Sequence, residues 1–178
     1  MAPPDLQPEY FNQRHVYRVG HGWDRHRLAT PDQGGRPLVV GGVRLESPVG
    51  PVAHSDGDAL LHAVTDALLG GSGHGDIGQL FPDSDPEFDG ADSLELLRRA
   101  AGLVDGMYII NNVDATVKLQ SPKLGAAREQ MEQNIASALG IDKNMVNVKG
   151  KTGEGIGEIG RGEAIEADVV MMMWGIMG

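Results

Sequence analysis

Cysteine is absent from the 178 residues of the chain, which excludes disulfide bonds, thiolate metal sites and cysteine nucleophiles. A metal ion must therefore be held by His, Asp or Glu side chains. Basic residues are few, because 15 Lys and Arg stand against 25 Asp and Glu and leave a formal net charge of -10. This charge disfavours binding to the phosphates of nucleic acid, so no nucleic-acid partner is expected.

Long apolar segments are absent too. No apolar run approaches the roughly 18 residues that a membrane span needs, and the N-terminus lacks the basic-then-apolar pattern of a secretory signal, so no membrane association is expected. Residues 1–15 show no helix or strand period, and we expect a flexible lead-in to a single domain over residues 16–178. The acidic composition favours a bacterial cytoplasm, or a plastid if the source is a photosynthetic eukaryote.

The hydrophobic pattern predicts strands that alternate with helices. Strands are predicted over residues 17–20, 37–40, 43–45, 107–110, 113–119, 146–149 and 164–174. Gly41-Gly42 is a two-residue hairpin signal between two of these strands. The run 169–174 is apolar on both faces, which predicts a place at the centre of the sheet or at a subunit interface.

Three helices are predicted from capping signals and apolar spacing. The first follows an N-cap at Ser55 and stops at Gly70-Gly71, the second runs from Asp92 to about Val104, and the third spans residues 122–139 and is closed by Gly140. Together with the strands they predict one α+β domain, in which helices pack on one face of a mixed β-sheet.

Four of the six histidines lie in two short windows, residues 20–26 and 53–62, beside carboxylates. Asp24 and His26 are two residues apart, so on an extended chain their side chains leave the same face. With His62 on the first helix they would supply three ligands and leave the open position of a catalytic metal. Asp58 and Asp66, one helical turn before and after His62, are predicted to fix its imidazole. Ordinary surface or core roles for these residues remain open.

Other polar residues suit a phosphate ligand. His54 and Ser55 precede the first helix, whose N-terminus would attract an anion, although Ser55 would equally serve as a cap. Thr152 and Glu154 follow a predicted strand and offer a hydroxyl for phosphate and a carboxylate for a hard cation. The acidic segments 75–78 and 81–85 are compatible with plain turns.

Seven short motifs follow one another along the chain. They are RVGHGWDRH at 18–26, AHSDGD at 53–58, LHA at 61–63, TDALLG at 65–70, GDIG at 75–78, LFPDSD at 80–85 and GADS at 90–93. In this order they resemble the 2-C-methyl-D-erythritol 2,4-cyclodiphosphate synthase family, and the likeness runs from about Tyr17 to the C-terminus. The chain is too short for the fused cytidylyltransferase of some members.

The resemblance implies roles for individual residues. It implies a zinc ion held by Asp24, His26 and His62, catalytic roles for His54 and Thr152, and a second divalent cation, Mg or Mn, that Glu154 faces at the diphosphate. It also implies that the substrate contacts Asp24, His26, His54, Ser55, Asp76, Ile77, Gly78, Phe81, Pro82, Asp83, Ser84, Asp85, Leu119, Gln120, Ser121, Pro122, Lys123, Leu124, Lys151, Thr152, Gly153, Glu154 and Arg161. Within this set, residues 119–124 correspond to the cytosine pocket of the family.

The resemblance further implies a homotrimer with active sites at the subunit interfaces and a cavity along the three-fold axis. Arg161 and Glu163 align with residues linked to a prenyl diphosphate in that cavity. Glu158 departs from the family pattern, because bacterial members often carry an aromatic residue there.

The reaction implied is a cyclisation. The 2-phosphate of 4-diphosphocytidyl-2-C-methyl-D-erythritol 2-phosphate attacks the β-phosphorus of its own diphosphate, and CMP leaves. Two alternatives remain on the residues alone. One is a metal-dependent hydrolase that admits water, and the other is a non-catalytic module that binds nucleotides or prenyl diphosphates.

Overall fold

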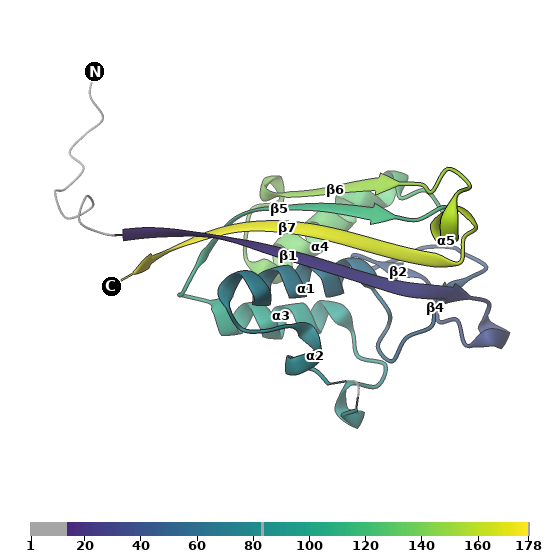
Figure 1. Ribbon diagram of the computed structural model, residues 1–178, viewed down its shortest axis with the longest axis horizontal. Coiled ribbons are helices and arrows are strands. Elements are labelled where there is room, and N and C mark those ends of the chain that lie inside the picture. Colours follow the sequence, from purple (N-terminus) through teal and green to yellow (C-terminus); the bar gives the residue numbers. More distant parts are fainter. Residues whose placement is uncertain (1–13, 83, 178) are drawn as a thin grey trace, which may run out of the picture.

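Two long antiparallel strands, β1 (Arg14–Ala29) and β7 (Ala164–Met177), pair with each other and are the longest strands of the domain. The computed structural model describes residues 14–82 and 84–177, and Figure 1 shows the two strands side by side along the whole sheet. β1 is much longer than the predicted strand 17–20, and it begins before the expected domain boundary at residue 16. The rest of the predicted lead-in, residues 1–13, lies outside the described residues.

The sheet is mixed, as predicted. Its order is β4-β1-β7-β5-β6, where β4 is Gly50–Pro51, β5 is Ile109–Lys118 and β6 is Val146–Lys151. β5 pairs antiparallel with β7 and parallel with β6. The two strands predicted at 107–110 and 113–119 are one strand, because a register shift between Ile110 and Asn112 lets it continue past the polar residues.

The predicted hairpin is also present. β2 (Val39–Val40) and β3 (Val43–Arg44) pair antiparallel around Gly41 and Gly42, whose φ angles of 59° and 71° suit glycine. Short helical turns fill the connections: η2 (Pro31–Gln33), α2 (Ile77–Leu80), η3 (Pro86–Phe88), η4 (Gly125–Ala127), η5 (Lys143–Met145) and α5 (Gly157–Gly160).

Three longer helices cover one face of the sheet. α1 (Ala59–Ser72) packs against β1 and β7, α4 (Arg128–Leu139) packs against β6, and α3 (Ser93–Val104) packs on α1 and α4. α3 has the predicted N-cap, since the Asp92 carboxylate accepts a hydrogen bond from the Leu94 N–H. α4 ends at Gly140, as predicted.

Two predicted helix starts are wrong. α1 begins at Ala59 with Asp58 as its N-cap, because Gly57 has a φ of 73° that no helix contains. α4 begins at Arg128 rather than at residue 122, because Gly125 has a φ of 37° and interrupts the helical backbone. Within residues 14–82 and 84–177, none of the helices combines the length and apolar character needed to cross a membrane.

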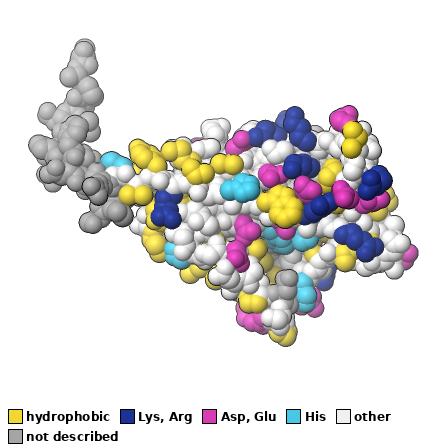
Figure 2. All heavy atoms as spheres, in the orientation of Figure 1, with side chains coloured by type: hydrophobic (Ala, Val, Ile, Leu, Met, Phe, Trp, Pro, Cys, Tyr) yellow, Lys and Arg dark blue, Asp and Glu magenta, His cyan; other side chains and the backbone are white. Residues whose placement is uncertain are grey.

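The Met-rich run is at the centre of the sheet, as one reading of the sequence predicted. Val169, Met171 and Met173 are fully buried against the helices, whereas Val170 points the other way and is 47% exposed. Tyr17, Val19 and Trp23 of β1 are likewise exposed on this second face. Figure 2 shows hydrophobic side chains on its half nearer the termini and charged side chains on the other half. Within the part of the chain that the structure describes, one face of the sheet is therefore left uncovered.

Candidate active site

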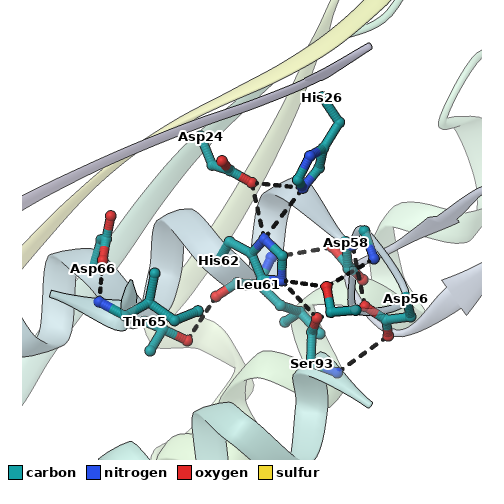
Figure 3. A network of polar contacts seen from close by, with 12 residues as sticks. Asp24, His26, Asp56, Asp58, Leu61, His62, Thr65, Asp66 and Ser93 are labelled. Atoms are coloured by element: carbon teal, nitrogen blue, oxygen red, sulfur yellow. Dashed lines mark hydrogen bonds and ion pairs between the residues drawn. The ribbon is translucent and has the colours of Figure 1, made fainter. Parts of the chain in front are cut away.

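Two glycines in β1 bring the candidate metal ligands together. A Cβ atom on Gly20 would lie 1.7 Å from the Ala67 carbonyl oxygen, and one on Gly22 would lie 1.9 Å from the Ala63 carbonyl oxygen. Only glycine allows α1 to rest so closely on the strand. Asp24 and His26 leave β1 on this same face, and His62 of α1 meets them there (Figure 3).

The three side chains form a cluster with the dimensions of a metal site. The Asp24 Oδ2 atom lies 3.0 Å from both the His26 Nε2 and the His62 Nδ1 atoms, and these two nitrogens lie 3.2 Å apart. Metal bonds of ~2.0–2.1 Å in a tetrahedron separate the ligand atoms by about 3.3 Å. The predicted triad is therefore confirmed as a candidate metal site, and its donor set suits zinc.

Charges within the triad shift its protonation equilibria in opposite directions. Burial disfavours the Asp24 carboxylate, but hydrogen bonds and charge attraction from His26 and His62 outweigh it and hold the Asp24 pKa well below its usual range. Burial likewise opposes the protonated form of His62, yet the hydrogen bond and charge of Asp24 raise the His62 pKa above its ordinary value. The Asp24 carboxylate thus stays ionised, and a metal ion that binds the triad must displace a proton from His62.

Asp58 and Asp66, which were predicted to fix the His62 ring, accept hydrogen bonds from other groups. Asp58 is fully buried and accepts hydrogen bonds from the N–H groups of Gly41, Gly42 and Leu61, which ties the hairpin to α1. Asp66 accepts the Ile77 N–H at 2.8 Å and so holds the start of α2. Neither carboxylate contacts the imidazole, because each is drawn to backbone N–H groups of a neighbouring segment.

Serine hydroxyls contact the second nitrogen of His62 instead. Its Nε2 atom lies 2.9 Å from the Ser93 Oγ and 3.2 Å from the Ser55 Oγ, and the Ser93 hydroxyl also reaches the Asp56 carboxylate. Ser93 is the first residue of α3, 31 positions from His62, so helical spacing gave no signal for this contact. Its place in the GADS motif is the one feature that singles it out.

A cavity of about 310 Å³ opens beside the triad. Its lining includes Asp24, His26, Val52, Ala53, His54, Ser55, His62, Ile77, Gly78, Phe81, Phe88 and Leu96. His54 is half exposed at this cavity, with its Nδ1 atom 3.5 Å from the Asp89 Oδ1 atom. His54 and Ser55 do not stand at the helix N-terminus as predicted, since α1 begins at Ala59 and Asp58 caps it, so the helix dipole gives no support to an anion site there.

Of the remaining predicted loop residues that the structure describes, Phe81 lines this cavity and the others do not. Asp76 caps α2 by accepting the Gln79 N–H at 2.9 Å, and Phe81 is 7% exposed with its ring against Phe88. Pro82, Ser84 and Asp85 are exposed and do not line the cavity, and Asp83 lies outside the described residues.

A second cavity, of about 500 Å³, contains most of the other predicted residues. It is lined by Val117, Leu119, Pro122, Lys123, Leu124, Gly125, Arg128, Gly150, Lys151, Thr152 and Glu154. Hydrogen bonds from the Leu119 N–H to the Lys151 carbonyl and from the Gly153 N–H to the Gln120 side chain join its two segments. The Thr152 hydroxyl donates to the Glu154 carboxylate, and Glu154 has a φ of 50°.

The two cavities have no lining residue in common. The triad lies on β1, whereas the second cavity is built where β5 and β6 end, and β7 lies between these strands. Arg161 belongs to neither cavity and forms a two-pronged ion pair with Glu163. One chain thus supplies the predicted site residues as two separate groups.

Comparison with known proteins decides the family. Residues 17–174 match the YgbB family. The chain belongs to this family. Among relatives of this YgbB protein, the 2-C-methyl-D-erythritol 2,4-cyclodiphosphate synthase of Bordetella avium is 54% identical over 158 residues, 88% of this chain and 95% of that protein. The synthase of Dechloromonas aromatica is 50% identical over 88% of this chain and 96% of its own length.

Solved structures share the fold of this YgbB protein. The CDP complex of IspF from Plasmodium falciparum has a TM-score of 0.76 at 37% identity, covering 89% of this chain and 96% of that one. The bifunctional IspDF from Campylobacter jejuni has a TM-score of 0.84 at 39% identity and covers 91% of this chain, which spans 43% of that longer protein. These matches confirm the resemblance inferred from the motifs and the single α+β domain inferred from the hydrophobic pattern.

Proposed function

We propose that this protein converts 4-diphosphocytidyl-2-C-methyl-D-erythritol 2-phosphate to 2-C-methyl-D-erythritol 2,4-cyclodiphosphate and CMP, a step of the non-mevalonate route to isoprenoid precursors. It is a phosphorus-oxygen lyase. The observation that carries the proposal is the Asp24, His26 and His62 triad, which opens into the cavity beside His54. The relatives named as this synthase support the substrate and the product.

The reaction balances within one molecule. An oxygen of the 2-phosphate forms a bond to the β-phosphorus, the bond from that phosphorus to the bridging oxygen of CMP breaks, and CMP leaves. The attacking phosphate is already anionic, so no general base is required. Phosphoryl transfer is accelerated mainly by positioning and charge neutralisation. Holding both ends of a flexible substrate together could supply ~7–11 kcal/mol.

The residues divide this work between them. A zinc ion held by Asp24, His26 and His62 would serve as a Lewis acid toward phosphoryl oxygens, typically worth several kcal/mol. His54 and Ser55 line the same cavity and contact phosphate, and Ile77, Gly78 and Phe81, which also line it, border the methylerythritol. The same role for Asp76 and residues 82–85 rests on the family resemblance. Thr152 contacts the diphosphate, and Glu154 faces a second divalent cation, Mg or Mn, through a hard carboxylate oxygen.

The assembled enzyme is a homotrimer with its sites shared between subunits. Two observations support this: the uncovered sheet face exposes large apolar side chains, and the triad and the second cavity are separate in one chain. The triad of one subunit would then face the second cavity of its neighbour. Residues 119–124 of that neighbour would hold the cytosine, and its residues 151–154 would hold the diphosphate. Mixing two inactive variants, His62→Ala and Thr152→Ala, should restore activity because mixed trimers regain one intact site. No recovery in demonstrably mixed trimers would contradict shared sites.

The remaining assignments are proposals that rest on the family. Residues 16–178 form the synthase domain, and the protein works in the cytoplasm. Arg161 and Glu163 would border an axial cavity that takes a prenyl diphosphate. The structure gives Glu158 a partner in Arg25 at 3.3 Å, so an ion pair occupies the position where many bacterial members carry an aromatic residue.

The assay that tests the function is CMP release with zinc and magnesium, followed by mass analysis of the product. Only cyclisation keeps both phosphates in one ring, whereas a hydrolase adds water and a binding module releases no CMP. His62→Ala should lose most of its zinc and nearly all turnover while the protein stays folded. His74→Ala, at an exposed histidine just beyond α1, is the matched control and should retain both. Full turnover by metal-stripped His62→Ala would refute the assignment.

A further inference from the structure

The His62 imidazole has two nitrogens with different surroundings. The Nδ1 atom faces Asp24 and His26 in the triad, and the Nε2 atom points away from them toward Ser93 (Figure 3). The Ser55 hydroxyl also lies near Nε2. A neutral imidazole carries its proton on one nitrogen and a lone pair on the other. Metal binding at the triad requires the lone pair on Nδ1, so the proton must sit on Nε2.

The direction of the hydrogen bonds at Ser93 is set by Asp56. One carboxylate oxygen of Asp56 lies 2.5 Å from the Ser93 Oγ and 3.2 Å from the Asp58 nitrogen, and the other lies 3.1 Å from the Ser93 nitrogen. A carboxylate only accepts hydrogen bonds, so the Ser93 hydroxyl donates its proton to Asp56. The Ser93 oxygen then presents lone pairs to His62, and the nitrogen opposite it, 2.9 Å away, must be the donor.

The contacts of Ser55 are compatible with a proton on the His62 Nε2 atom. Its hydroxyl oxygen accepts the Gly57 N–H at 3.1 Å and lies 3.2 Å from the same nitrogen of His62. Ser93 is 1% exposed and the His62 side chain is 12% exposed, so solvent has little access to supply an alternative partner. The chain from Asp56 through Ser93 to His62 therefore favours a proton on Nε2. On the other side of the ring the Asp24 carboxylate, 3.0 Å from Nδ1, would accept a proton there until a metal ion takes that place.

We propose that Asp56 and Ser93 are positioning residues for the metal site, which fix the His62 tautomer with its proton on Nε2 and its Nδ1 lone pair aimed at the metal. The inference rests on the metal site of the proposed function and assigns a task to two residues outside the ligand set. It also explains why the start of α3 is joined to the 54–56 segment, where the Asp56 N–H donates to the Ala91 carbonyl and the Gly90 N–H to the His54 carbonyl.

The test is a double-mutant cycle on zinc affinity, measured without substrate by competition with a chromophoric chelator. Asp56→Ala frees the Ser93 hydroxyl to donate to His62, and Ser93→Ala removes the link itself. Loss of such outer partners typically lowers metal affinity by about 10- to 100-fold. Because both residues act through one chain, the double variant should bind zinc no more weakly than the weaker single variant.

The control is Asp92→Ala. Asp92 also lies at the start of α3, where it caps the Leu94 N–H at 2.8 Å, but it does not contact His62. Its loss should lower the melting temperature and leave zinc affinity unchanged. A second readout is the ¹⁵N spectrum of the neutral His62 ring in the metal-free protein, where Asp24 and Ser93 compete for the proton; the share of the Nε2–H tautomer should be larger in the wild type than in Asp56→Ala.

The outcomes separate the inference from the function. Additive losses of zinc affinity in the double variant, or an unchanged tautomer in Asp56→Ala, would overturn the proposed chain. Should Asp56→Ala fail to fold, Ser93→Ala removes a single oxygen and decides alone: wild-type zinc affinity with an unchanged tautomer overturns the inference. Neither measurement uses the substrate, so a protein that releases no CMP would refute the proposed function and leave this result standing.

Discussion

Gly22 is the position where one added methyl group should disturb both stability and the metal site. Its Cβ would lie 1.9 Å from the Ala63 carbonyl oxygen, and contacts under about 3.0 Å essentially do not occur, so α1 and β1 must separate by roughly 1 Å. The obstacle is helix backbone, which cannot rotate away. Overpacking of this kind costs up to ~3 kcal/mol, and for a domain of this size that lowers the melting temperature by about 6–12 °C.

The same displacement should weaken zinc binding. His62 precedes Ala63 on α1, and Asp24 follows Gly22 by two residues on β1, so the gap opens between two ligands that now lie 3.0 Å apart. Metal–ligand distances tolerate about 0.2 Å, and a shift of roughly 1 Å should lower zinc affinity at least as much as loss of an outer partner, ~10- to 100-fold.

The assay for Gly22→Ala is chelator competition for zinc together with thermal unfolding of the metal-free protein. Gly70→Ala is the matched control, because it also adds one methyl group at the α1 region but nothing lies within 4 Å of its Cβ. Alanine is the better helix former by ~1 kcal/mol, so this control should be as stable as the wild type or more so. Wild-type zinc affinity and melting temperature in Gly22→Ala would refute the reasoning.

Three further predictions follow from contacts in and around the site. Asp58→Ala removes a helix cap worth ~1 kcal/mol and leaves two glycine N–H groups without their acceptor at ~1–3 kcal/mol each. Urea unfolding should therefore report a loss of about 3–7 kcal/mol, and a loss below ~2 kcal/mol would contradict it. In the metal-free protein, protonated His62 stabilises the fold because its pKa is higher in the folded than in the unfolded chain. This stabilisation is complete below the unfolded pKa of about 6.5 and is lost as the pH rises through the folded pKa. The melting temperature should therefore fall as the pH rises from about 6.5 through the folded pKa in the wild type, but not in His62→Ala. Glu154→Gln should raise the magnesium requirement for turnover without lowering zinc content, and identical magnesium titrations would argue against its role.

Local patterns were sufficient for the parts of the site that depend on neighbouring residues. The spacing of Asp24 and His26 predicted two side chains on one face because a strand alternates strictly, whatever lies around it. The Gly41-Gly42 hairpin and the Asp92 cap were predicted for the same reason, since their geometry is set within four residues. The motifs, taken in order, were sufficient for the family.

Contacts between distant segments were beyond the reach of such patterns. Asp58 and Asp66 have helical spacing to His62, yet both accept backbone N–H groups from other segments, and the partner of His62 is Ser93 on another helix. α1 begins later than predicted because Gly57 has a positive φ, and that φ depends on the fold of the loop around it.

Residue identity and order were enough to specify the ligand types, their alternation along β1 and the family. Which of these residues meet depends on long-range packing. It placed His62 within 3.2 Å of His26 because two glycines let α1 lie on β1, and it separated the triad from the second cavity because β7, the last strand in the chain, inserts between β1 and β5. Within the described residues one sheet face stays uncovered because the long helices pack on the other face, a consequence of long-range packing that no local pattern contains.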